Sequence, residues 1–124
     1  MQIQQKKKTD TTLQIYKKYL DMIYYVNDIT RKYPKHERFV LVQETKRSTL
    51  KGIRCIIFAS KEFSKQGKLK YLNELDALLK IQKVYIRMAF KYQYITQKNY
   101  ETWSNMLTDV CNLLGGWIKS CLKE

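Results

Sequence analysis

The stretch that decides the fold is YPKHERFVLVQETKRSTLKGIRCIIFASKEFSKQ, residues 33–66. At about 100° per residue, a helix from Pro34 to about Ser64 gathers an apolar stripe on one narrow arc. The stripe consists of Phe39, Val42, Thr49, Ile53, Ile56, Ser60 and Phe63. A second arc of about 80°, well away from the stripe, is basic. It consists of Arg47, Lys51, Arg54, Lys61 and Lys65. We therefore expect one face to pack against other helices while a row of positive charge faces outward.

Apolar residues also recur every three or four positions before this stretch, which predicts a helix that ends near Lys32. They are Leu13, Tyr16, Leu20, Ile23, Val26 and Ile29. Asp10, Thr11 or Thr12 is the expected cap, because a side-chain oxygen there can accept from free backbone N–H groups. Proline disfavours helical geometry in the residue before it, so Tyr33-Pro34 ends this helix, and Pro34 suits the first turn of the next.

Two more helices are predicted after residue 66. Gly67 is expected to stop the preceding helix in the left-handed conformation, and the third helix runs from near Lys68 to about Gln93. Thr96 is the expected cap of the fourth. The residues expected on the buried side of that helix recur every three or four positions: Tyr100, Trp103, Leu107, Val110, Leu114 and Trp117. Four helices with short links predict an all-α, antiparallel up-down four-helix bundle over residues 11–122, preceded by a flexible basic tail at residues 1–10.

The third helix carries more apolar surface than the core of such a bundle needs. One stripe consists of Leu72, Leu75, Leu79, Ile86 and Phe90, and a second of Leu78, Ile81, Tyr85, Met88 and Tyr92. The second stripe indicates a subunit or partner contact, with a central helix in a small monomer as the alternative. Gly52 indicates either close approach of a neighbouring helix or a tolerated flaw. Gly115-Gly116 either stops the last helix or lets a partner backbone come close.

The charge is strongly positive and unevenly distributed. Twenty-four Lys and Arg against eleven Asp and Glu give a net charge of +13, and such an excess favours polyanions. Residues 1–34, 35–66 and 67–95 carry +4, +5 and +4, whereas residues 96–124 are neutral. The last helix is therefore expected to be a packing element.

A second basic row lies on the third helix, where Lys80, Lys83, Arg87 and Lys91 fall within about 80°. Like charges at this spacing repel one another, so two such rows predict binding of RNA or DNA through the phosphate backbone. A solvated helix face, or a surface for an acidic protein, is the alternative. The ten tyrosines either pack in the core or stack on single strands, and Tyr24, Tyr25 and Tyr94 are the candidates for stacking.

No pattern for catalysis, a cofactor or a metal is found. The single histidine, His36, and the cysteines Cys55, Cys111 and Cys121 lack the spacing of a zinc cluster. No HExxH, GxSxG or phosphate-binding loop occurs. We expect a non-enzymatic, cytoplasmic protein without a membrane segment, because no apolar run reaches the length of a membrane span and no signal peptide pattern occurs.

Two stretches resemble the signatures of a known family. Tyr33-Pro34-Lys35-His36-Glu37-Arg38-Phe39 with Leu41, and Leu113-Leu114-Gly115-Gly116-Trp117-Ile118-Lys119-Ser120, resemble those of the Avd family. Avd is the accessory variability determinant of diversity-generating retroelements, and it belongs with the four-helix-bundle proteins encoded by intervening sequences in ribosomal RNA genes. The chain departs from the pattern at Tyr33, where phenylalanine is usual, and at Thr45, where an apolar residue is expected.

The resemblance implies a homopentamer that binds a reverse transcriptase and its template RNA and supports mutagenic cDNA synthesis without chemistry of its own. We expect phosphate contacts from the two basic rows, through Arg47, Lys51, Arg54, Lys61, Lys80, Lys83, Arg87 and Lys91. Helix ends and the subunit contact are expected to involve Pro34, Tyr85, Met88, Gly115, Gly116 and Trp117. The alternative is a structural or interaction bundle of the intervening-sequence type, whose basic surface meets an acidic protein.

Overall fold

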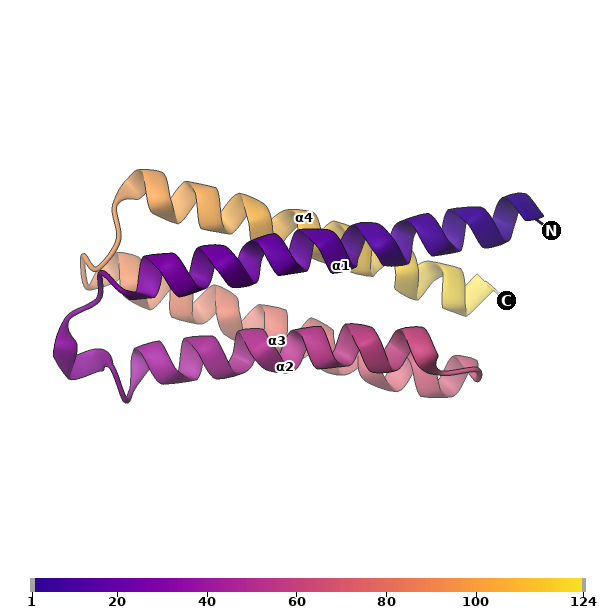
Figure 1. Ribbon diagram of the computed structural model, residues 1–124, viewed down its shortest axis with the longest axis horizontal. Helices are drawn as coiled ribbons and strands as arrows, with labels where there is room; N and C mark the ends of the chain where they lie inside the picture. The colour runs from indigo at the N-terminus through magenta and orange to yellow at the C-terminus, as the bar shows by residue number, and fades with distance from the viewer. Residues whose placement is uncertain (1, 124) are drawn as a thin grey trace.

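The structure is a computed structural model that describes residues 2–123, with side chains described for residues 11–123 (Figure 1). Its elements are α1 (Gln2–Thr30), the short 3-10 helix η1 (Lys35–Glu37), α2 (Leu41–Lys61), α3 (Lys65–Lys91) and α4 (Gln97–Lys123). Within this part of the chain there is no strand, and the predicted all-α four-helix bundle is confirmed.

The helices run alternately up and down, and each packs against the two that flank it (Figure 1). Helix α1 contacts α2 and α4, and α3 contacts the same two helices, whereas the diagonal pairs do not meet among the described residues. The links from α1 to α2 and from α3 to α4 lie at one end of the bundle. Both chain termini and the link from α2 to α3 lie at the other end.

The core faces of α1 and α2 coincide with the predicted stripes only in part: Val26 and Ile29 of α1 and Thr49 and Ile56 of α2 are buried as predicted. In α1 the buried residues are Ile15, Tyr19, Met22, Val26 and Ile29, whereas Leu13 and Tyr16 from the predicted stripe are exposed. Two apolar stripes therefore run along the first half of α1. Packing buries the one with Ile15, Tyr19 and Met22, and leaves Leu13 and Tyr16 of the other at the edge beside α2.

In α2 the predicted stripe is only partly confirmed: Thr49 and Ile56 are buried, but the rest of the core face consists of other residues, several of them small and polar. The whole core face consists of Leu41, Thr45, Ser48, Thr49, Gly52, Cys55, Ile56 and Ala59. The hydroxyl of Thr45 donates to the Leu41 carbonyl (2.6 Å) and that of Thr49 donates to the Thr45 carbonyl (2.8 Å). Such local bonds allow small polar side chains to be buried at little cost. Phe39 and Phe63 lie outside α2 and are exposed.

Gly52 sits in this face because α1 approaches it closely, which confirms one of the two predictions for that residue. An added Cβ would overlap the Tyr19 hydroxyl. That hydroxyl donates to the Thr49 carbonyl (2.6 Å) and accepts from Gln82 Nε2 of α3 (3.1 Å). One buried polar cluster thereby joins three of the four helices.

Several predicted helix ends differ from the structure. Helix α2 begins at Leu41 rather than Pro34, because residues 35–37 form η1 and Val40 (φ −118°, ψ −92°) is not helical. Gly67 does not stop a helix: Ser64 caps α3 three residues earlier and accepts from the Gly67 N–H (3.0 Å). Helix α3 instead ends at Lys91, and Gln93 adopts the left-handed conformation (φ 63°).

The start of α4 is as predicted, whereas the start of α1 is not. Thr96 caps α4, since its Oγ1 accepts from the Asn99 N–H (3.1 Å). Gly115 and Gly116 do not end α4, which continues to Lys123. Helix α1 starts at Gln2, so the cap predicted at Asp10, Thr11 or Thr12 is wrong: these residues lie inside the helix, whose backbone includes most of the predicted tail at residues 1–10. Met1 lies outside the described residues, and the flexibility of that segment stays a prediction.

Candidate nucleic-acid interface

The basic residues predicted on the second helix all lie on its exposed side. Arg47, Lys51, Arg54 and Lys61 are solvent-exposed, and they follow the arc of α2 that lies furthest from the buried face. Lys65 is also exposed but belongs to the first turn of α3. The charged row forms here because α2 packs only through its Thr45–Ala59 face, which leaves the opposite arc to water.

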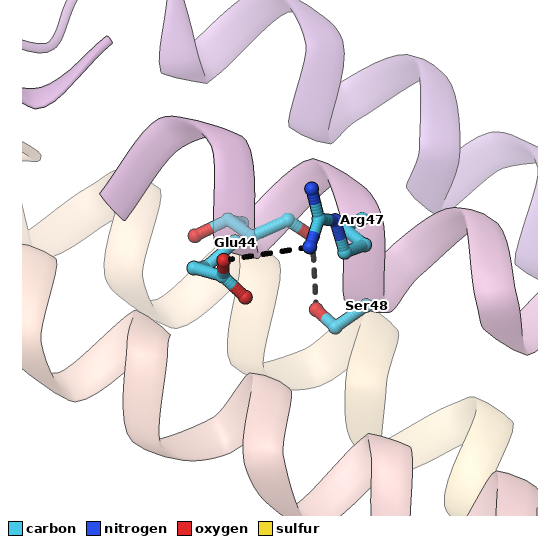
Figure 2. A network of polar contacts seen from close by, with 4 residues as sticks. Glu44, Arg47 and Ser48 are labelled. Atoms are coloured by element: carbon cyan, nitrogen blue, oxygen red, sulfur yellow. Dashed lines mark hydrogen bonds and ion pairs between the residues drawn. The ribbon is translucent and has the colours of Figure 1, made fainter. Parts of the chain in front are cut away.

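One member of this row is partly neutralised. Figure 2 shows Arg47 beside Glu44, one turn earlier in α2, with Nη1 and Oε1 4.0 Å apart. Ser48 lies next to this pair, and its hydroxyl donates to the Thr45 carbonyl (2.9 Å). Both charged side chains are about half exposed, so the pair is weak and Arg47 can exchange its partner.

Lys51 and Arg54 border a groove between α2 and α3. The groove has a volume of 390 Å³ and is lined by Lys51, Arg54, Cys55, Phe58, Tyr71 and Glu74. Within the described part of the chain Arg54 forms no ion pair; its guanidinium carbon instead lies 5.8 Å from the centre of the Phe58 ring. Burial, followed by the nearby Glu74 carboxylate, raises the pKa of the Cys55 thiol in this groove to about 11.

Lys61 lies near the end of α2, away from this groove. Together with Lys65 and Lys68 it lines a cavity of 740 Å³ at the end of the bundle that holds the chain termini. Lys68 is already engaged, because its ammonium donates to the Ala59 carbonyl (3.0 Å). Lys61 therefore belongs to a different local surface from Arg54.

The second row, on α3, is exposed as well. Lys80 donates to Asp76 (2.6 Å), and this hydrogen bond raises the pKa of the lysine. Lys83, Arg87 and Lys91 are exposed and form no ion pair among the residues that the structure describes. Three of the four cations in this row are thus available to a ligand.

The two rows face different edges of the bundle. Burial raises the pKa of the Cys111 thiol on α4, and the positive charges of Lys83 and Lys80 on α3 act in the opposite direction. The two lysines must lie near Cys111 to have this effect, so they border the seam between α3 and α4. On the opposite side of α3, Tyr71 and Glu74 face α2. The rows are therefore two parallel tracks rather than one continuous patch.

The three tyrosines predicted as stacking platforms have different surroundings. Tyr24 is 62% exposed. Tyr25 is half-buried against Trp103, and its hydroxyl donates to the Asn99 carbonyl (3.3 Å). Tyr94 donates to Glu37 (2.7 Å) and lies among other rings at the end of the bundle. Only Tyr24 offers an open ring.

The exposed aromatic pair beside the basic row was not predicted. Phe58 and Tyr71 stack with ring centres 5.3 Å apart and an interplanar angle of 26°. Lys70, which no row included, lies with its ammonium 6.0 Å from the centre of the Tyr71 ring. Phe58 follows Arg54 by four residues and so lies on the same arc, a spacing that the sequence does contain.

The residues predicted for helix ends and the subunit contact are dispersed. Pro34 precedes η1, and Trp117 is buried in the core of its own chain. Tyr85 and Met88 are half-buried on α3, in a stripe whose neighbours Ile81 and Val84 are exposed. Gly115 and Gly116 have open space where a Cβ would lie. Among the described residues nothing lies within 4 Å of a Cβ added at either glycine, and their part in a subunit contact stays a prediction.

No other kind of site is evident in the described residues. No group of three or more His, Cys, Asp or Glu side chains there is placed to hold a metal ion. None of the helices in residues 2–123 combines the length and the hydropathy that crossing a membrane requires.

Comparison with known proteins places the chain in a sequence family. Residues 13–121 match the family described as bAvd-like. Solved structures with the same fold include a protein of unknown function from the S23 ribosomal protein family of Bacteroides thetaiotaomicron. It is 22% identical, covers 88% of this chain and 98% of its own, and superposes with a TM-score of 0.79. No curated protein matches the chain.

Proposed function

The chain belongs to the bAvd-like family, and from this premise we propose that it is a non-enzymatic accessory protein of a diversity-generating retroelement. In this role it binds the retroelement's reverse transcriptase and template RNA and supports mutagenic cDNA synthesis. The protein supplies a charged scaffold, and the polymerase supplies the chemistry.

The observation that carries this proposal is the pair of basic tracks. Of the eight candidate cations, only Arg47 and Lys80 have a carboxylate partner among the described residues. Unpaired exposed cations at helical spacing repel one another, and that repulsion is relieved when a polyanion neutralises them. The regular spacing along two rigid helices suits a repeating charge such as a phosphate backbone.

Charge reversal tests the RNA-binding part of the proposal. Arg54→Glu combined with Arg87→Glu removes one unpaired cation from each track and should weaken RNA retention on filters tenfold or more. The matched control is Lys98→Glu with Lys119→Glu, which changes the net charge equally on exposed positions of α4. Retention that is unchanged in the first variant, or lost equally in both, would refute the assignment.

A salt titration separates this function from the alternative, an interaction protein with an acidic partner. Binding through phosphates releases counterions, so the logarithm of the affinity should fall linearly with the logarithm of salt concentration. The Arg54→Glu, Arg87→Glu variant should have a shallower slope than the control. Absence of RNA binding at low salt would favour the acidic-protein alternative.

Self-association is also part of the proposal, and the family resemblance indicates a homopentamer. Its support is apolar surface that the single chain leaves exposed on two separate faces. One is the α1–α2 seam, defined here as Leu13, Tyr16, Ile23, Tyr24, Leu50 and Ile57. The other is the α3 stripe, defined as Ile81, Val84, Tyr85 and Met88. A closed ring requires two different faces that meet, so a cyclic oligomer would use both.

A further inference from the structure

The groove between α2 and α3 contains a column of two aromatic rings with a cation at each end. Arg54 lies over Phe58, Phe58 stacks on Tyr71, and Lys70 lies over Tyr71, with successive separations of 5.8, 5.3 and 6.0 Å. The first two residues come from α2 and the other two from α3. Two rigid helices therefore hold the column in position.

This column lies open to solvent, although aromatic side chains at such spacing usually pack inward. Phe58 is 42% exposed, Tyr71 is half-buried and Lys70 is exposed. The adjoining 390 Å³ groove has Lys51 on its rim and the neutral Cys55 thiol at its floor. A partly exposed ring pair, covered by the Arg54 guanidinium and bordered by Lys51 and Lys70, matches the groups that bind unpaired nucleotides: aromatic or guanidinium planes for the bases and cations for the phosphates.

We propose that the α2–α3 groove, bounded by Arg54, Phe58 and Tyr71, is a stacking site for an unpaired base of a single-stranded nucleic acid. This inference rests on the proposed function and specifies its ligand as single-stranded rather than duplex. The base inserts between the Phe58 ring and the Arg54 guanidinium, which can move off the ring because no ion pair holds it among the described residues. Lys51 and Lys70 contact the phosphates on either side.

Glu74 is the only carboxylate that lines the groove. A carboxylate repels phosphate but accepts a hydrogen bond from the amino group of a base. Its place beside the stacked rings therefore favours a base in the groove over a phosphate. A duplex cannot use the site, because pairing and stacking hide the faces of its bases.

The test measures fluorescence anisotropy with three labelled 12-nucleotide probes: oligoadenylate RNA, a blunt RNA duplex and an abasic oligonucleotide. Phe58→Leu keeps the apolar volume and removes the aromatic face. It should weaken oligoadenylate binding about tenfold, since stacking of one base contributes that much, and leave the other two probes unchanged. A fourth probe, oligoadenylate DNA, should respond like the oligoadenylate RNA, because the two share the same base.

The matched control is Phe63→Leu. Phe63 is fully exposed and lies between Lys61 and Lys65, but it has no ring or cation paired with it in the described structure. This variant should bind oligoadenylate like the parent. Circular dichroism melting confirms that both variants fold, and equal losses in the two would overturn the assignment to the column.

Arg54→Lys adds a second readout, since it keeps the charge but removes the planar guanidinium. It should weaken oligoadenylate binding several-fold while leaving the salt slope and duplex binding unchanged. If Phe58→Leu and Arg54→Lys both bind oligoadenylate like the parent while Arg54→Glu with Arg87→Glu loses RNA, the stacking site is refuted and phosphate binding stands. If the charge reversals also have no effect, the proposed function itself fails.

Discussion

Gly52 lies where α1, α2 and α3 contact one another. The Tyr19 hydroxyl occupies the place of its missing side chain, and Gln82 holds that hydroxyl from the third helix. Gln82 Nε2 also lies 3.3 Å from the Ser48 carbonyl, so the cluster fixes the register of α1, α2 and α3 together. A glycine in a helix costs stability by itself, and here it is required by the neighbouring ring.

A glycine-to-alanine pair tests this requirement. Gly52→Ala should lower the free energy of unfolding by about 2 kcal/mol, because overpacking outweighs the gain in helix propensity. Gly115→Ala should raise it by about 0.5–1 kcal/mol, because nothing lies within 4 Å of the added Cβ. Urea denaturation measures both. A stabilising Gly52→Ala would contradict the close approach of Tyr19.

Cys55 predicts a dependence of stability on alkaline pH. Its folded-state pKa of about 11 lies above the ordinary thiol value, chiefly because burial disfavours the thiolate. The unfolded chain therefore loses the thiol proton first, and the stabilisation present at neutral pH is lost as pH rises through 11.

Urea denaturation of the reduced protein from pH 7 to 11 measures this loss. The free energy of unfolding should fall above about pH 8.5 by up to 1.4 kcal/mol per pH unit from this group. Cys55→Ala should show a shallower decline over the same range. Identical pH profiles for the two proteins would contradict a buried neutral thiol.

At the scale of elements, η1 links the start of α2 to the turn between α3 and α4. Tyr94 Oη donates to Glu37 Oε2 (2.7 Å), His36 Nε2 lies 3.3 Å from the same hydroxyl, and the Tyr33 ring packs on Tyr94 at 5.3 Å. These contacts hold residues 33–37 against the α3–α4 link, which lies at the same end of the bundle. They account for the departure of this segment from the α2 axis and for the late start of α2.

Tyr94→Phe tests this link, because it removes the hydrogen bonds and keeps the ring. The melting temperature should fall, and by less than in Gly52→Ala, because the hydroxyl is near the surface. Glu37→Gln should also lower it, and the double variant should lose less than the sum of the two single losses, since the residues share one bond. Additive losses would mean that the two side chains act independently.

At the scale of the whole molecule, the four helices bury a common core but leave apolar side chains exposed on the outside of the bundle. The α1–α2 seam and the α3 stripe repeat with helical spacing yet remain half-buried or exposed. The proposed stacking groove involves Tyr71 and Glu74 in the first half of α3, whereas the α3 stripe lies in the second half, at residues 81–88.

Native mass measurement tests the two apolar faces. Leu50→Gln with Ile57→Gln, in the seam, should reduce the oligomer to monomers, and Ile81→Gln with Met88→Gln, in the α3 stripe, should do the same. Leu122→Gln is the control, since it replaces an exposed apolar residue near the end of α4. An oligomer of unchanged mass in both double variants would show that neither face forms the contact.

The sequence by itself determined the number of helices, the cap at Thr96 and the exposure of both basic rows. These features depend on local spacing, and a row of charged side chains on a helix stays exposed because burying it would cost too much free energy. The family signatures also occur within local segments, and the match over residues 13–121 agrees with them.

Tertiary structure alone decided which apolar stripe of α1 enters the core and where α2 begins. It also decided the close approach of Tyr19 to Gly52 and the stacking of Phe58 on Tyr71. Residues one position apart on a helix can form equally regular stripes, so periodicity cannot choose between them. The choice follows from buried polar groups and ring contacts between helices, which exist only after the helices have packed.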